Sequence, residues 1–168
     1  MTAAAVLLVL VTVGRLGELW LARRNTAALL ARGAVEIAPG HYPLIVALHT
    51  AWLAALWIYG AAQPVNPVWL AVFLGLQAAR VWVLMTLGRR WTTRIIVTPG
   101  EWLVAKGPYR FVNHPNYLVV VGEIAALPLC LGLPWVALVF SALNAAVLMV
   151  RIQAENAGLK QAHRDATA

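Results

Sequence analysis

The chain has 168 residues, of which 62% are hydrophobic and only 11% are charged. In a soluble domain of this length, about a quarter of the residues are normally charged, so the composition excludes a soluble domain and indicates an integral membrane protein. We expect a single domain over residues 1–168. The single cysteine, Cys130, excludes an internal disulfide, whereas the formal net charge of +7 would by itself suit a nucleic-acid partner.

Five apolar runs are long enough, or nearly so, to cross a bilayer as helices, which takes about 20 residues. In chain order they cover roughly residues 2–22, 42–62, 67–88, 115–133 and 134–157. Four residues join the second run to the third, and the fourth meets the fifth at Leu133-Pro134. We therefore expect an all-α membrane protein with about five transmembrane helices and two tight helical hairpins, in which prolines start the following helices.

Two longer connections cover residues 23–41 and 89–113. The first has the pattern of a short amphipathic helix over residues 26–37. The second contains a β-like segment at 93–97, a turn at 98–100 and a stretch at 101–105 that would return as a second strand. A lone hairpin of this kind would need packing support from the rest of the protein.

The cations outside the predicted spans follow one rule. All ten lie in the two long connections and the C-terminal tail, and the two hairpin loops have none. This positive-inside pattern predicts an N-terminus outside, and both long connections and the C-terminus in the cytoplasm. The basic residues thus reflect topology and contact with anionic membrane lipids, and no nucleic-acid partner is expected.

Six charged side chains nevertheless fall inside the predicted spans: Arg15, Glu18, Arg80, Glu123, Arg151 and Glu155. Each would cost about 2.5–3.5 kcal/mol at a helix centre, so they must face one another or water. We expect them to line a polar cavity that opens to the cytoplasm beneath the loop around His114. No metal site is expected, because the four histidines lie on separate segments without ligand spacing.

The six charges carry different weight. Arg15 and Glu18 fit a plain ion pair near a helix end, whereas Arg80 and the i,i+4 pair Arg151–Glu155 favour a functional site. Glu123 is consistent with either role, because it could simply pair with an arginine.

The stretch from Lys106 to Tyr117 gathers two cations, an imidazole and two phenols just before an apolar run. Together with Arg151-x-x-x-Glu155 and the upstream Arg80-x7-Gly88-x-x-Trp91, it resembles the isoprenylcysteine carboxyl methyltransferases over about residues 77–159. These are integral membrane enzymes that use S-adenosylmethionine. The chain departs from the usual family pattern at Asn113 and Asn156, where arginine and glutamate are common.

The resemblance implies a role for each matching residue. The expected cofactor-binding residues are Gln77, Gly107, Tyr109, Arg110, His114, Pro115, Tyr117 and Glu155. The expected catalytic residues are Arg80, Arg151 and Glu155, and the expected acceptor contacts are Arg80, Trp91 and Arg94. In physical terms, Glu155 could pair with the cofactor's ammonium, while His114 or Arg110 could bind its carboxylate.

The runs around Trp91 and His114 are most similar to a bacterial branch that methylates the enol hydroxyl of alkylpyrones. This branch favours a lipophilic acidic hydroxyl as acceptor and the bacterial inner membrane as location, with a prenylcysteine-like or other lipid carboxylate as the next candidate. Three other functions stay open: a sterol-reductase-like enzyme using NADPH, a non-catalytic membrane scaffold or lipid-binding subunit, and N-methylation of a lipid amine. The sequence does not specify an oligomeric state.

Overall fold

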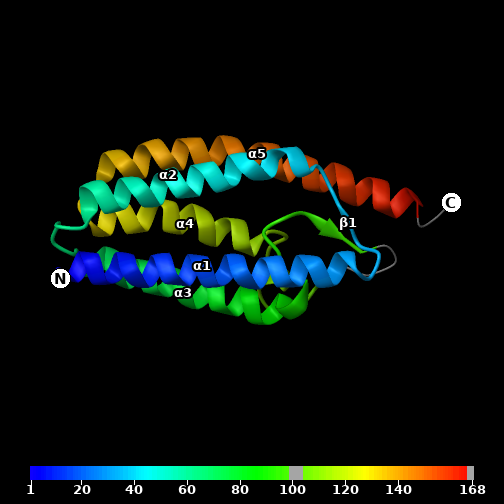
Figure 1. The fold of residues 1–168 in the computed structure, drawn as a ribbon, viewed down its shortest axis with the longest axis horizontal. Helices are drawn as coiled ribbons and strands as arrows, with labels where there is room; N and C mark the ends of the chain where they lie inside the picture. The colour runs from blue at the N-terminus through cyan, green and yellow to red at the C-terminus, as the bar shows by residue number, and fades with distance from the viewer. Residues whose placement is uncertain (99–103, 166–168) are drawn as a thin grey trace.

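The chain folds as an elongated bundle of long helices that run side by side (Figure 1). A computed structural model describes residues 1–98 and 104–165, without the side chains of residues 156 and 158–165. The helices are α1 (Ala3–Leu30), α2 (Tyr42–Gly60), α3 (Pro67–Leu87), α4 (Pro115–Cys130) and α5 (Pro134–Asp165). Three single-turn 3₁₀ helices lie between them, namely η1 (Pro39–His41), η2 (Gly88–Arg90) and η3 (Gly107–Arg110).

Four of these helices are long and apolar enough to cross a membrane, over Ala3–Leu30, Pro39–Gly60, Pro67–Arg90 and Pro134–Glu155. The protein is therefore an integral membrane protein. The predicted fourth span is shorter than expected, because α4 has 16 residues, or about 24 Å at 1.5 Å per residue. It ends at Cys130 because Gly132 adopts a positive φ of 66° and the Leu133 amide turns back to the Pro128 carbonyl at 2.9 Å.

The core lies around α4, which packs against α2, α3 and α5. Buried side chains, among them Leu56, Ile124 and Leu127 with at most 1% of their surface exposed, form the main apolar cluster. A second and smaller cluster joins α1, α3 and the following connection through Ala22, Val83 and Trp91. The charged residues described below lie on the same helices as these clusters.

The connections are sorted by length between the two ends of the bundle (Figure 1). The N-terminus, the α2–α3 connection and the α4–α5 connection lie at one end, which we call the short-loop end. The connections that follow α1 and α3, and the C-terminus, lie at the opposite, long-loop end. The two short connections are tied together by a hydrogen bond of 2.8 Å from the Asn66 amide to the Cys130 carbonyl.

One local expectation about the long connections is wrong, and another falls largely outside the described residues. Residues 26–37 do not form a separate amphipathic helix, because α1 continues to Leu30. β2 (Ile96–Val97) pairs antiparallel with β1 (Val35–Glu36) of the other connection. Residues 104 and 105 are not in a strand, whereas 101–103, and 99–100 of the predicted turn, lie outside the described residues.

Candidate functional site: two polar clusters along the bundle

The first polar cluster is a charge network centred on Glu123 of α4. Arg80 of α3 donates from Nε to Glu123 Oε1 at 2.8 Å and from Nη2 to Glu123 Oε2, while its Nη1 reaches Glu18 of α1 at 3.2 Å. Arg15 of α1 bonds both Glu18 and Glu123, at 2.7 and 2.8 Å. Gln77 of α3 donates to Glu123 Oε1 at 2.6 Å. We call these five residues the Glu123 network.

The Glu123 network is electrically neutral, with two arginines against two carboxylates. Its central pair is nearly inaccessible, since Glu123 is 3% exposed and Arg80 is 5% exposed. The expectation that charges within the spans face one another therefore holds here. Pairing of this kind removes most of the cost of charge in an apolar environment.

The network changes the interpretation of two predicted site residues. All three guanidinium nitrogens of Arg80 bond to Glu18 or Glu123, which favours a structural role over the predicted contact with the acceptor. Gln77, predicted to contact the cofactor, has its amide on Glu123 instead. Spacing along α3 indicates that these side chains share a face, but not which neighbouring helix that face meets.

The second polar cluster joins the start of α4 to the long-loop half of α5. Arg151 donates from Nε to the Tyr117 hydroxyl at 2.7 Å, and this hydroxyl donates to Glu155 Oε2. His114 Nδ1 lies 3.7 Å from the same carboxylate oxygen, and its ring stacks on Tyr117 with 5.0 Å between centroids. We call these four residues the Glu155 cluster; Arg151 and Glu155 meet in it through the Tyr117 hydroxyl.

The Glu155 cluster is open to solvent on one side. The side chains of His114 and Glu155 are 27% and 24% exposed, whereas Arg151 is only 8% exposed. Within the described part of the chain, the Nη nitrogens of Arg151 make no ion pair. The cluster thus combines a partly exposed carboxylate with a largely buried cation whose Nη nitrogens form no ion pair with the described residues.

The loop before α4 packs beside this cluster. Gly107 adopts a φ of 52°, and a Cβ at this position would lie only 2.5 Å from Thr86 Oγ1 of α3. Burial, and then the carboxylate of Glu155, raise the pKa of Tyr109 to about 12, so this phenol stays neutral near physiological pH. Pro115 is buried in the first turn of α4, and Arg110 is exposed.

Two buried polar atoms close to these elements lack a partner among the described residues: the indole nitrogen of Trp91 and the side-chain oxygen of Asn116. Trp91 is 2% exposed and packs in the second apolar cluster, against which Tyr109 also lies. Buried polar groups are normally satisfied, so unpaired ones are consistent with a ligand or water at this place.

Sequence reasoning missed two polar contacts that hold the long connections. Asn25 of α1 is buried and donates to the backbone carbonyls of Gly88 and Trp91, at 3.2 and 2.8 Å. Glu36 of β1 accepts from Arg94 Nη1 with both carboxylate oxygens, each at 2.9 Å. An asparagine late in an apolar helix was the only available signal for the first contact, and nothing indicated the second.

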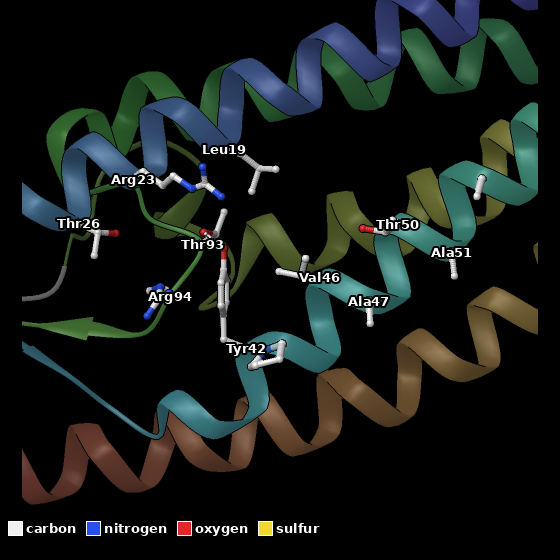
Figure 2. A pocket seen from close by; sticks show the side chains of 12 residues that line it. Leu19, Arg23, Thr26, Tyr42, Val46, Ala47, Thr50, Ala51, Thr93 and Arg94 are labelled. Atoms are coloured by element: carbon white, nitrogen blue, oxygen red, sulfur yellow. Dashed lines mark hydrogen bonds between the residues drawn. The ribbon is translucent and has the colours of Figure 1, made fainter.

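The predicted single polar cavity beneath His114 is not the arrangement found. The six charges separate into the two clusters, and a cavity of about 650 Å³ opens elsewhere, between α1 and α2 (Figure 2). Thr93 and Arg94 line its long-loop end, together with Arg23, Thr26 and Tyr42. A smaller cavity of about 160 Å³ between α1 and α3 is bordered by Arg15, Glu18 and Gln77.

Similarity to known proteins identifies the class to which this fold and these clusters belong. The sequence profile of the isoprenylcysteine carboxyl methyltransferase (ICMT) family matches residues 69–161. This match covers more than half of the chain and includes both clusters except the α1 residues. The chain therefore belongs to the ICMT family, whose members are membrane methyltransferases.

Two bacterial relatives match along most of their length. "Uncharacterized protein YpbQ" of Bacillus subtilis is 38% identical over 160 residues, which cover 92% of this chain and 95% of the relative. An "Uncharacterized protein" of Haemophilus influenzae is 26% identical over 142 residues, which cover 81% of this chain and 83% of the relative. No solved structure gives a significant match.

Proposed function

We propose that the chain is an S-adenosylmethionine-dependent methyltransferase whose acceptor is an acidic oxygen on a lipid. The acceptor would be the enol hydroxyl of an alkylpyrone-like lipid or, failing that, a prenylcysteine or other lipid carboxylate. The observation that carries the proposal is the Glu155 cluster, in which a partly exposed carboxylate, a stacked imidazole and a buried arginine meet toward the long-loop end of the bundle (Figure 1).

The residues present fit the cofactor. Glu155 would pair with its ammonium, and His114 or the exposed Arg110 would bind its carboxylate. Tyr117, whose ring already stacks on His114 and lies 5.4 Å from the Arg151 guanidinium carbon, would contribute its hydroxyl, and the unpaired Asn116 oxygen offers a buried acceptor. When bound, S-adenosylmethionine would supply the methyl group from its sulfonium.

Arg151 is the residue best placed to act on the acceptor. Its buried guanidinium keeps donors free within the described part of the chain, and an anion beside it would be stabilised in the low dielectric of the bundle. An acidic enol or a carboxylic acid bound there would lose its proton without a dedicated base. Arg80, held in the Glu123 network, would fix the positions of α3 and α4 behind the site.

The competing functions are supported less well. A non-catalytic scaffold would use unpaired intramembrane charges for assembly, whereas the Glu123 network is already neutralised within this chain. Methylation of a lipid amine would bring a cationic acceptor next to Arg151, which would repel it. An NADPH-dependent reductase would belong to a different class from the family that the sequence matches.

Binding of the cofactor is the direct test. Purified protein in detergent should bind S-adenosylmethionine in the micromolar range typical of cofactor sites, about −8 kcal/mol, measured by isothermal titration calorimetry. His114→Ala and Glu155→Ala should each weaken binding about tenfold or more, because each removes a charge-assisted contact. Lys106→Ala, an exposed cation just before η3, is the matched control and should bind normally. Tight binding of NADPH, or unchanged affinity in both variants, would refute the proposal.

A further inference from the structure

The cavity between α1 and α2 has a polar end and an apolar body (Figure 2). On α2 its wall consists of side chains three or four positions apart, from Tyr42 through Val46, Ala47, Thr50 and Ala51 to Ala54. The alanines leave space that larger side chains would fill, so α1 and α2 do not close against each other here. The wall extends about 18 Å along the helix at 1.5 Å per residue.

The polar end of the groove carries an excess of positive charge. Arg94 is neutralised by Glu36, and its guanidinium lies 4.5 Å above the Tyr42 ring, whose hydroxyl is 3.1 Å from Thr93 Oγ1. Arg23 of α1 also lines this end, and within residues 1–98 and 104–165 it makes no ion pair. One net positive charge thus lies near three hydroxyl groups, those of Thr26, Tyr42 and Thr93, at the mouth of an apolar groove.

We propose that this groove binds the methyl acceptor, as a single-chain lipophilic acid. Arg23 and the hydroxyls of Tyr42 and Thr93 would contact the polar head group, the acidic oxygen that receives the methyl group would point toward Arg151, and the chain would follow α2 toward Ala54. The inference rests on the proposed function. The inference adds to the proposed function the place where the acceptor binds and the single-chain shape of the acceptor.

Three observations support this occupant over a bilayer phospholipid. The volume of about 650 Å³ lies within the range of small-molecule sites, roughly 300–1,000 Å³. On α2 the groove follows one line of mostly small side chains from Val46 to Ala54, a shape suited to a single hydrocarbon chain. Thr93 and Arg94 at its polar end follow Trp91 in the chain. Trp91 packs in the same apolar cluster as Tyr109 of η3, so the polar end is connected through this cluster to the loop proposed to bind the cofactor.

Most of the lining residues come from α1 and α2, which lie outside residues 69–161, the region matched by the family profile. The groove is thus a property of this chain's own N-terminal half. The specificity for the acceptor would accordingly be encoded in α1 and α2, and the methyl-donor site in the region shared with the family.

Photocrosslinking tests the location without relying on catalysis. An alkylpyrone with a diazirine in its alkyl chain should label the α2 peptide that contains residues 46–54 in the wild-type protein, as read by mass spectrometry. Excess unlabelled alkylpyrone should prevent this labelling, and phosphatidylglycerol at the same concentration should not. Labelling confined to other helices, or protection by phosphatidylglycerol, would overturn the proposal.

The second test measures KM for the acceptor in variants of residues that line the groove. Ala51→Phe should raise KM for a long-chain acceptor about tenfold or more, because several methylenes lose their binding surface, while KM for a short-chain acceptor changes little. Ala71→Phe, on an exposed face of α3 outside the groove, is the matched control.

Arg23→Gln should raise KM severalfold, whereas Arg24→Gln should not, since Arg24 lies over Trp20 and does not line the groove. Equal effects of each variant and its control would also overturn the proposal.

The two proposals fail in different ways. If the wild-type protein binds no S-adenosylmethionine, the proposed function fails, and the crosslinking result still reports what the groove holds. If methyl transfer proceeds but the label maps away from α2, the groove assignment alone fails.

Discussion

At Glu123, a single buried carboxylate holds two arginines and a glutamine from two other helices. Because the pair with Arg80 is almost fully buried, removing the negative charge would leave a guanidinium uncompensated in an apolar environment. We expect Glu123→Gln to lower the free energy of unfolding by about 3–5 kcal/mol, measured by denaturation in detergent micelles.

The control for Glu123 is Glu18→Gln in the same network. The Glu18 side chain is 19% exposed, so water can screen the loss, and a smaller destabilisation is expected. A Glu123 variant as stable as the wild type would show that the network does not hold the bundle together. In that case Arg80 would again be a candidate for acceptor binding.

Tyr109 allows a prediction about pH. Its pKa is raised to about 12 in the folded protein, above the usual value near 10. The stability that this phenol contributes is therefore fully present below about pH 10 and is lost as the pH rises through 12. The difference in tyrosinate absorbance between the wild type and Tyr109→Phe should titrate with a midpoint near 12. A midpoint near 10 would mean that Tyr109 is solvated and not packed beside Glu155.

At the scale of elements, η3 is positioned by its contact with the end of α3. Gly107→Ala would introduce a Cβ 2.5 Å from Thr86 Oγ1 at a residue whose φ is +52°, so we expect the strained backbone of η3 to shift relative to the Thr86 side chain of α3. Since Tyr109 and the start of α4 follow directly, affinity for S-adenosylmethionine should fall about tenfold or more, as measured by calorimetry.

Gly40→Ala is the matched control for Gly107→Ala. Gly40 belongs to η1 in the other long connection, has no positive φ, and has no atom within 4 Å of the Cβ position. Its substitution should leave cofactor affinity unchanged. Normal affinity in Gly107→Ala would show that η3 does not help to build the cofactor site.

Sequence patterns predict the helices better than they predict which helices meet. Each of the five apolar runs predicted from hydropathy overlaps one of the helices α1 to α5, because a bilayer requires long apolar segments. The spacing of Arg80 and Gln77 indicated a shared face, but their common partner, Glu123, lies 43 and 46 residues away in the chain. The pairing of β1 with β2 could not be predicted, because two-residue strands carry no periodic pattern and the register depends on where α1 and α3 end.

The division of the six charges into two clusters has the same cause. Which charges meet depends on the rotation and neighbours of each helix, and these are set by packing around α4. The roles predicted for Arg151, Glu155, His114 and Tyr117 stay predictions, although the structure brings these four side chains together.

At the scale of the whole molecule, the sorting of connections by length has a consequence for orientation. The long-loop end carries the cations of both long connections, so the positive-inside rule predicts that this end faces the cytoplasm. The proposed function requires the same orientation, because the polar cofactor would reach the Glu155 cluster from the cytoplasm.

Single cysteines introduced into a Cys130→Ala background would test this orientation in intact cells. Gln63→Cys, exposed in the α2–α3 connection, should react with a membrane-impermeant maleimide added outside. Lys106→Cys, exposed just before η3, should react only after the membrane is opened. Both positions are exposed, so a difference in labelling reports the side of the membrane and not local burial. Labelling of both from outside would place the Glu155 cluster away from the cofactor pool and would contradict orientation and proposed function together.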